Sequence, residues 1–75
     1  MAAKPGKLRQ VLARNIRNLR SKRGITQEEL AHRARIHRTY MSSVERAQRN
    51  VSIDNIERIA AGLEVAPQDL LVDRR

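Results

Sequence analysis

Apolar residues recur at helical spacing near the start of the chain. From Leu8 onward they mostly fall three or four residues apart, which places them on one face of a helix. These positions are Leu8, Val11, Leu12, Ile16 and Leu19. Gly24 follows Lys22 and Arg23, and glycine readily adopts the left-handed conformation that ends helices. The pattern therefore predicts a first helix that begins after residue 7 and ends before Gly24.

Two shorter helical patterns follow within residues 27–46. Thr26 precedes Glu29 by three residues, a capping box that marks a helix start. Apolar or small side chains then occur at Leu30, Ala31, Ala34, Ile36, Met41 and Val44. The step from Ile36 to Met41 breaks the helical period, so we expect a turn near residues 35–37 and another helix over 38–46. This arrangement is typical of a helix-turn-helix, whose second helix enters the DNA major groove.

The remainder of the chain predicts two more helices. Ser52 can cap a fourth helix, whose apolar face comprises Ile53, Ile56, Ile59, Ala60 and Leu63. Gly62 inside it costs about 1 kcal/mol relative to alanine. Pro67 suits the first position of a short fifth helix. We therefore expect one compact all-α domain of five helices over residues 8–72, with a flexible arm at 1–7 and a tail at 73–75.

The charge of the chain favours an anionic partner. The 75 residues carry a formal net charge of +8, and the pI is near 11.5. Thirteen of the sixteen basic residues are arginine, whose planar fork fits phosphate and guanine. A soluble basic surface without a nucleic-acid partner is the alternative. Cysteine is absent, and neither an apolar run as long as a membrane span nor a signal segment is visible, so we expect a cytoplasmic, nucleoid-associated protein.

The helix predicted over 38–46 has one side made of short polar side chains between two arginines. At about 100° per residue, this side comprises Arg38, Thr39, Ser42, Ser43 and Arg46. Arg38 can make a forked contact to guanine, and Thr39 can offer a hydroxyl to a base or a methyl to thymine. We predict base reading by Arg38, Thr39, Ser42 and Ser43. Contact of Arg38 with phosphate alone is the alternative.

Other polar residues near this helix are suited to the DNA backbone. Gln27 begins the preceding helix and can donate to a phosphate where the helix dipole favours negative charge. Further candidate phosphate contacts are Tyr40, Arg46, Arg49, Asn50 and Ser52. Arg20 and Glu45 are the best candidates for an ion pair between the first and third helices, and two unrelated surface charges are the alternative.

The sequence gives little support to catalysis or metal binding. His32 and His37 are five residues apart and have no third ligand, so solvent-facing roles are favoured. The serines lack a placed His–Asp pair. Glu28 and Glu29 fit helix capping better than acid–base catalysis. We therefore expect no enzyme activity, no metal and no cofactor.

The stretch from about residue 16 to residue 71 resembles the phage-repressor-like (Cro-type, XRE) helix-turn-helix family. The matching segments are Ile16–Arg20, Gly24–Ala31, Val44–Arg46, Ile59–Ala60 and Leu63–Val65. The resemblance implies a lambda-repressor-like domain of five helices that binds operator DNA, usually as a dimer. By position it implies phosphate binding by Gln27, base reading by Arg38, Thr39 and Ser43, and an Arg20–Glu45 ion pair. Arg35 and Ala47 stand where the family often has glycine.

Residues 38–46 together with 49–56 are also similar to the controller proteins of restriction–modification systems. These are small dimeric regulators that activate or repress by occupying operators. A dimer is expected on physical grounds too, because one recognition helix contacts only about four or five base pairs. Apolar candidates for the dimer interface are Val65, Leu70, Leu71 and Ile53, although Leu70 could equally belong to the core.

Together these features predict a sequence-specific regulator that binds double-stranded DNA as a homodimer on a pseudo-palindromic operator, of the restriction–modification controller type. A phage-type repressor or an antitoxin-like regulator is the alternative within the same class. A non-specific basic nucleic-acid-binding protein and a protein-interaction module are alternatives from other classes. The lone aromatic residue, Tyr40, argues against base-stacking platforms. RNA polymerase is a further candidate partner.

Overall fold

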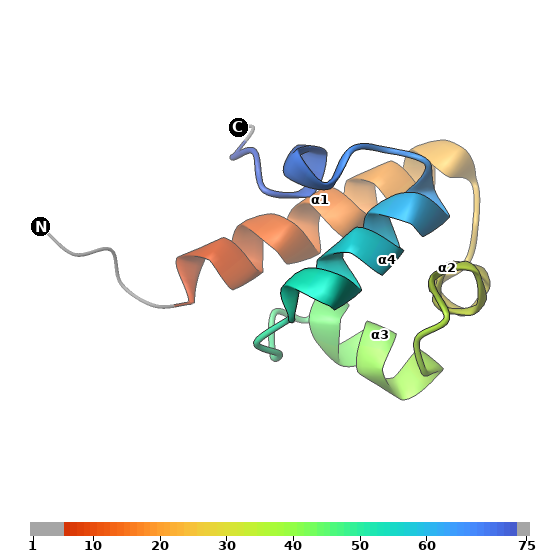
Figure 1. The fold of residues 1–75 in the computed structure, drawn as a ribbon, viewed down its shortest axis with the longest axis horizontal. Coiled ribbons are helices and arrows are strands. Elements are labelled where there is room, and N and C mark those ends of the chain that lie inside the picture. Colours follow the sequence, from red (N-terminus) through yellow and green to blue (C-terminus); the bar gives the residue numbers. More distant parts are fainter. Residues whose placement is uncertain (1–5, 74–75) are drawn as a thin grey trace, which may run out of the picture.

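A computed structural model describes residues 6–73. Over this range the chain forms four α-helices and one short 3-10 helix, which are α1 (Lys7–Arg23), α2 (Gln27–Ala34), α3 (Arg38–Glu45), α4 (Ile53–Leu63) and η1 (Pro67–Leu70). Figure 1 shows α4 crossing in front of α1, with α3 below them and α2 seen end-on at the right. The C-terminal segment returns across α1, and η1 contacts both α1 and α4.

Every one of these elements contributes to a single apolar core. Its buried members are Leu12, Ile16, Leu30, Ala31, Ala34, Met41, Val44, Ile59, Ala60, Leu63 and Leu70. On the face predicted for the first helix, Val11, Leu12 and Ile16 are buried and Leu19 is partly buried, but Leu8 is 57% exposed. The reason is that the first turn of α1 projects past the core.

The helix starts and stops follow the predicted local chemistry. The Thr26 hydroxyl oxygen accepts a hydrogen bond from the Glu29 N–H at 3.0 Å, and Ser52 accepts one from the Asn55 N–H at 3.1 Å. Gly24 ends α1 with a φ of 67°. The Glu29 carboxylate accepts a bond from Arg33 at 2.9 Å. Serine and threonine caps of this kind stabilise a helix by about 1 kcal/mol.

The prediction of a fifth α-helix is wrong. Residues Pro67–Leu70 form a 3-10 helix, in which the Asp69 N–H donates to the Ala66 carbonyl at 2.9 Å. Four residues are too few for a stable α-helical turn pattern, and 3-10 geometry is common in pieces this short. The described residues therefore contain four α-helices.

The expected ends of the domain also shift slightly. α1 begins at Lys7, within the predicted arm, and Gly6 precedes it with a φ of 108°. Residues 1–5 of the arm and residues 74–75 of the tail lie outside the described residues. Asp73, predicted as tail, accepts a hydrogen bond from Arg14 at 2.6 Å. The ordered packing of the domain therefore extends to Asp73.

Asn15 on α1 fixes the C-terminal segment to the core. Its side-chain amide donates to the Leu70 carbonyl at 2.9 Å and to the Val72 carbonyl at 2.8 Å. Asn15 is itself buried, and buried amides of this kind are costly to leave without partners. These two bonds hold η1 against α1, which buries Leu70 completely.

Gly62 allows α2 and α4 to approach closely. A Cβ atom at this position would lie 3.1 Å from the Leu30 Cδ1 and 3.4 Å from the Ala34 backbone nitrogen. The cost of glycine inside a helix is therefore offset by packing against α2. This contact supports the helix-turn-helix from behind, because α2 is its first helix.

Candidate nucleic-acid interface

The tight turn between α2 and α3 depends on a left-handed arginine. Arg35 has a φ of 58°. The next residue, Ile36, donates its N–H to the Ala31 carbonyl at 3.0 Å, which closes the end of α2. A left-handed conformation costs a non-glycine residue about 1–2 kcal/mol. The turn directs α3 across α2, in the arrangement of a helix-turn-helix.

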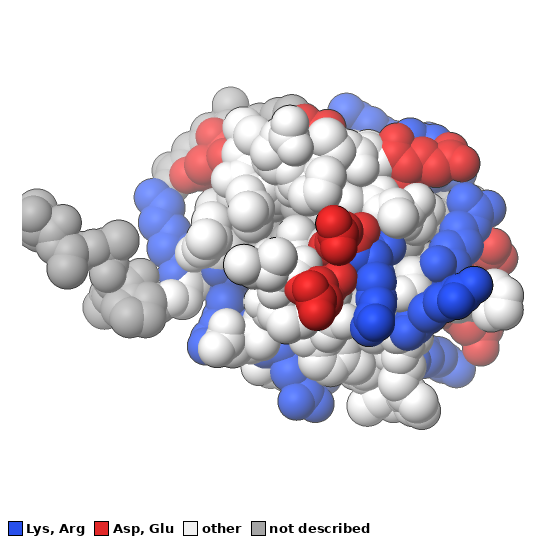
Figure 2. Space-filling model, viewed as in Figure 1, with Lys and Arg blue, Asp and Glu red and all other residues white. Residues whose placement is uncertain are grey.

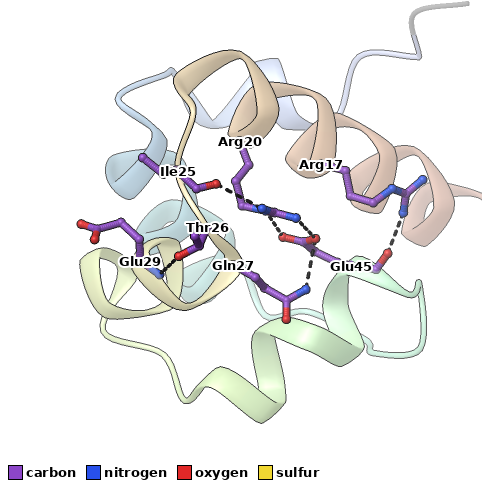
Figure 3. A network of polar contacts seen from close by, with 7 residues as sticks. All are labelled: Arg17, Arg20, Ile25, Thr26, Gln27, Glu29 and Glu45. Carbon is purple, nitrogen blue, oxygen red and sulfur yellow. Dashed lines mark hydrogen bonds and ion pairs between the residues drawn. The ribbon is translucent and has the colours of Figure 1, made fainter.

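A buried carboxylate holds the two helices of this unit against α1. Glu45, at the end of α3, accepts two hydrogen bonds from the Arg20 guanidinium, at 2.8 Å and 3.0 Å. Arg20 also donates to the Ile25 carbonyl at 3.1 Å. The Gln27 side-chain amide donates to the same carboxylate at 3.2 Å. Figure 3 shows these side chains converging from α1, α2 and α3.

Arg17 adds a second link between α1 and α3. Its guanidinium donates to the Glu45 backbone carbonyl at 2.6 Å (Figure 3). This carbonyl is one of the acceptors left without a partner at the end of a helix. Arg17 and Arg20 therefore fix the C-terminal end of α3 through different oxygens of one residue.

The exposed side of α3 carries several of the predicted DNA contacts. Side chains from the start of α2 and from α3 line one hollow on this side, and they are Gln27, His37, Arg38, Thr39, Ser42 and Arg46. Arg38 and Thr39 are exposed, and Ser42 is half-buried. Arg46 donates to the Ser42 hydroxyl at 2.5 Å and to Gln48 at 3.1 Å. These side chains form a polar surface with an arginine at each end.

Arg38 is only loosely held in the free protein. It begins α3, and its guanidinium lies 3.6 Å from a Glu28 carboxylate oxygen. Both side chains are largely exposed, so this pair contributes little to stability. Arg38 can therefore exchange Glu28 for an acceptor on another molecule at small cost.

Ser43 does not belong to this surface. It is buried, its hydroxyl donates to the Tyr40 carbonyl at 2.8 Å, and it accepts a bond from Arg49 at 2.8 Å. The predicted base-reading role for Ser43 is inconsistent with this position. The physical reason is that Ser43 faces inward beside Val44, where α3 packs on the core.

The remaining phosphate candidates lie on α3 and in the loop that follows it. The guanidinium of Arg49 stacks over the Tyr40 ring at 5.3 Å from its centroid, and Tyr40 itself is half-buried. Arg49 and Asn50 are exposed in the loop that follows α3. Ser52 is exposed too, but its hydroxyl already caps α4. Donors to a phosphate are therefore available at both ends of α3.

The four apolar residues predicted at a dimer interface separate into two groups. Leu70 is fully buried, so its assignment to the interface is wrong, and Val65 is half-buried against the core. Ile53 is 82% exposed and Leu71 is 37% exposed. Both line a groove with Leu8, Leu12 and Ile56, and the groove reaches Arg49 and Asn50. This groove lies directly beside the loop that follows α3.

Charge is not concentrated on the α4 side of the molecule. Figure 2 shows separate basic and acidic groups on that side, together with a broad uncharged area. Within residues 6–73, no group of three His, Asp or Glu side chains could hold a metal ion. Among the same residues, no helix is long and apolar enough to cross a membrane.

Sequence reasoning missed two residues near this surface. His37 was expected only to face solvent, yet its Nδ1 atom accepts a hydrogen bond from the Thr39 N–H at 3.1 Å. The available signal was its place directly before α3, although histidine is not a common cap. Arg17 was given no role, and its place one turn before Arg20 was the signal.

Comparisons with known proteins agree with this geometry. Residues 11–72 match a family model described as a helix-turn-helix domain. The chain is 48% identical over 65 residues to the control protein C.BamHI of Bacillus amyloliquefaciens, covering 85% of this chain and 80% of that protein.

Two crystal structures also share this fold. The hypothetical transcription factor NHTF from Neisseria superposes with a TM-score of 0.87 at 44% identity, covering 97% of this chain and 84% of that one. The restriction–modification controller protein C.AhdI from Aeromonas hydrophila superposes with a TM-score of 0.80 at 39% identity, covering 83% and 94%. The chain therefore belongs to the XRE-type helix-turn-helix family of DNA-binding transcription regulators, which includes the control proteins of restriction–modification systems.

Proposed function

We propose that this protein is a sequence-specific transcriptional regulator that binds a pseudo-palindromic operator as a homodimer. The observation that carries the proposal is a row of side chains on α3, made of the exposed Arg38 and Thr39 and the half-buried Ser42, with the exposed Arg46 directly after it. Arginine reads guanine through two parallel hydrogen bonds, and short hydroxyl side chains let the helix lie close to base edges. The network around Glu45 presents this row from a rigid support.

Gln27, Arg49 and Asn50 are assigned to the DNA backbone. Gln27 lies at the start of α2, where helix N–H groups and the helix dipole favour a phosphate. Its amide nitrogen donates one hydrogen to Glu45 and retains a second for another acceptor. Arg49 and Asn50 follow α3 in an exposed loop. Contacts of this type position a protein on the duplex without reading its sequence.

The partner for the apolar groove is assigned as a second copy of this chain. Ile53 and Leu71 are exposed there beside Leu8, and adjoining exposed apolar side chains are found at sites where proteins associate. The groove is continuous with the loop 46–52. A two-fold axis through the groove would therefore bring the C-terminal ends of the two α3 helices toward each other. Two copies double the number of base pairs read, with half-sites about one helical turn apart.

The 48% sequence identity to the control protein C.BamHI supports a narrower role, in controlling a restriction–modification system. This role predicts that the operator occurs upstream of a gene for a methyltransferase or an endonuclease in the genome that encodes the chain. A reporter joined to that upstream region should then respond to the amount of this protein. An operator found only upstream of unrelated genes would favour a phage-type or antitoxin-like regulator.

Selection from a randomised duplex library tests the proposal. The expected result is an enriched sequence with two-fold symmetry, protected over both half-sites in a footprint. Sedimentation should show two protein chains on each selected duplex. Equal binding to selected and scrambled duplexes, with a steep salt dependence for both, would identify a non-specific basic protein instead. A monomer that protects one asymmetric site would contradict the dimer.

A further inference from the structure

His37 holds the first turn of the helix that carries the base-reading row. It precedes Arg38 with an extended backbone, and its Nδ1 atom accepts a hydrogen bond from the Thr39 N–H at 3.1 Å. This is the geometry of a helix cap, which serine, threonine, asparagine or aspartate usually supplies. The cap fixes the backbone of Thr39 next to Arg38, at the start of the row.

This cap depends on the protonation state of the imidazole. A ring nitrogen accepts a hydrogen bond only when it carries no proton, so the proton of a capping His37 must be on Nε2. A second proton would turn Nδ1 into a donor that faces the Thr39 N–H, another donor. It would also place a positive charge at the positive end of the α3 dipole.

The same protonation adds a cation to a surface that faces phosphate. His37 lines one hollow with Arg38 of α3, with Arg46 directly after α3 and with Gln27 of α2. Arg38 is itself paired with Glu28 of α2, whose carboxylate oxygen lies 3.6 Å from its guanidinium. Arg35 adds a further positive charge in the preceding turn. A charged His37 therefore strengthens general attraction to the DNA backbone, which does not depend on sequence.

We propose that neutral His37 is a positioning residue for sequence recognition, and that its protonation lowers sequence discrimination while it raises non-specific DNA affinity. Histidine is the side chain that ordinarily changes charge between about pH 5 and pH 8. The ratio of specific to non-specific affinity should then fall as the pH falls, although the total positive charge rises. This inference rests on the proposed sequence-specific binding.

The experiment measures the affinity of the full chain for two probes, the duplex enriched by selection and a scrambled duplex of the same composition. Both affinities are measured at about pH 7.5 and about pH 5.5 at constant ionic strength, which spans the titration of histidine. A cap is worth about 1 kcal/mol, or about five-fold in an equilibrium constant. Loss of the cap should therefore lower the specific to non-specific ratio of the wild type at the lower pH, by up to about five-fold.

Three variants separate the cap from the fold and from general charge. His37→Asn keeps a capping oxygen that does not titrate, so its ratio should stay high at both pH values. His37→Ala lacks any cap, so its ratio should be low and independent of pH. His32→Ala is the matched control, because His32 is exposed on α2 outside the hollow and its loss should leave the pH dependence intact.

Equal pH dependence in the wild type and in His37→Asn would overturn the role of His37, and so would a wild-type ratio that does not change with pH. Failure to enrich any duplex would instead overturn the proposed function as a whole. Because His37→Asn keeps a cap, a low ratio for His37→Ala beside a high one for His37→Asn would support positioning by the cap.

Discussion

Replacing Arg20 with methionine should destabilise the fold strongly, because it leaves a buried carboxylate without its main partner. The Glu45 side chain is only 4% exposed, and the Arg20 side chain that covers it is 23% exposed. The variant would remove both hydrogen bonds from Arg20 to the carboxylate, at 2.8 Å and 3.0 Å. Only the amide of Gln27, at 3.2 Å, would remain as a side-chain donor.

The size of the effect follows from the burial of Glu45. Removing one partner of a buried ion pair costs about 3–5 kcal/mol, whereas an exposed pair is worth under about 1 kcal/mol. A domain of this size changes its melting temperature by about 4–8 °C for each kcal/mol. Arg20→Met should therefore lower the melting temperature by at least about 12 °C. The total stability of a small domain is only about 5–10 kcal/mol, so the variant retains little.

Thermal unfolding followed by circular dichroism measures this difference. Lys22→Met is the matched control, since Lys22 is exposed on the same helix. Arg17 is unsuitable as a control, because it also donates to Glu45. Replacing Glu45 with leucine in the Arg20→Met background should restore much of the loss, because two apolar residues can replace a buried pair. Equal melting temperatures for Arg20→Met and Lys22→Met would refute this reasoning.

Three further variants test other parts of the account. Ser52→Ala removes the cap of α4, so the free energy of unfolding should fall by about 1 kcal/mol. Because Ser52 is also a predicted phosphate contact, binding to selected and scrambled duplexes should weaken equally, and an altered base preference would contradict this. Ile53→Glu should convert the proposed dimer to a monomer in sedimentation without lowering the monomer's stability, because Ile53 is 82% exposed; a dimer that persists in this variant would locate the interface elsewhere. Ala47→Gly should stabilise the fold by up to about 1 kcal/mol, because Ala47 has a φ of 60°, while Ala61→Gly within α4 should destabilise it similarly; calorimetry giving the reverse order would be inconsistent with both.

Helix ends were predictable from the sequence because their chemistry is local. Thr26 and Ser52 each bond to an N–H three residues later, and Gly24 takes the conformation that other residues avoid. The break between Ile36 and Met41 likewise required a turn, whatever surrounds it. At Pro67–Leu70 the segment is short enough to favour a 3-10 helix, but its position against α1 depends on bonds from the distant Asn15 and was not visible in the sequence.

The orientation of α3 could be predicted only in part. Ser43 lies between Ser42 and Val44 in sequence, at the boundary of the helix's two sides, and only the packing of Arg49 and Tyr40 places it inside. The burial of Leu70 depended in the same way on contacts between distant segments. Gly62 looked unfavourable in an isolated helix, since the close approach of Leu30 cannot be seen in the sequence. Local patterns therefore predicted the elements, and tertiary contacts decided which residues face outward.

Base discrimination by Arg38 tests sequence reading by α3 most directly. The affinities of the wild type, Arg38→Ala and Arg38→Lys are measured on the selected operator and on duplexes that differ from it by one base pair. The wild type should lose about 1–3 kcal/mol when the guanine contacted by Arg38 is changed. For Arg38→Ala, changing this guanine should no longer lower the affinity, while changes at the other base pairs should lower it as in the wild type. Arg38→Lys should keep its overall affinity but discriminate poorly at this base pair, because lysine retains the charge without the fork. Equal loss of affinity for all duplexes in Arg38→Ala, with full recovery in Arg38→Lys, would show a phosphate contact and contradict base reading by this residue.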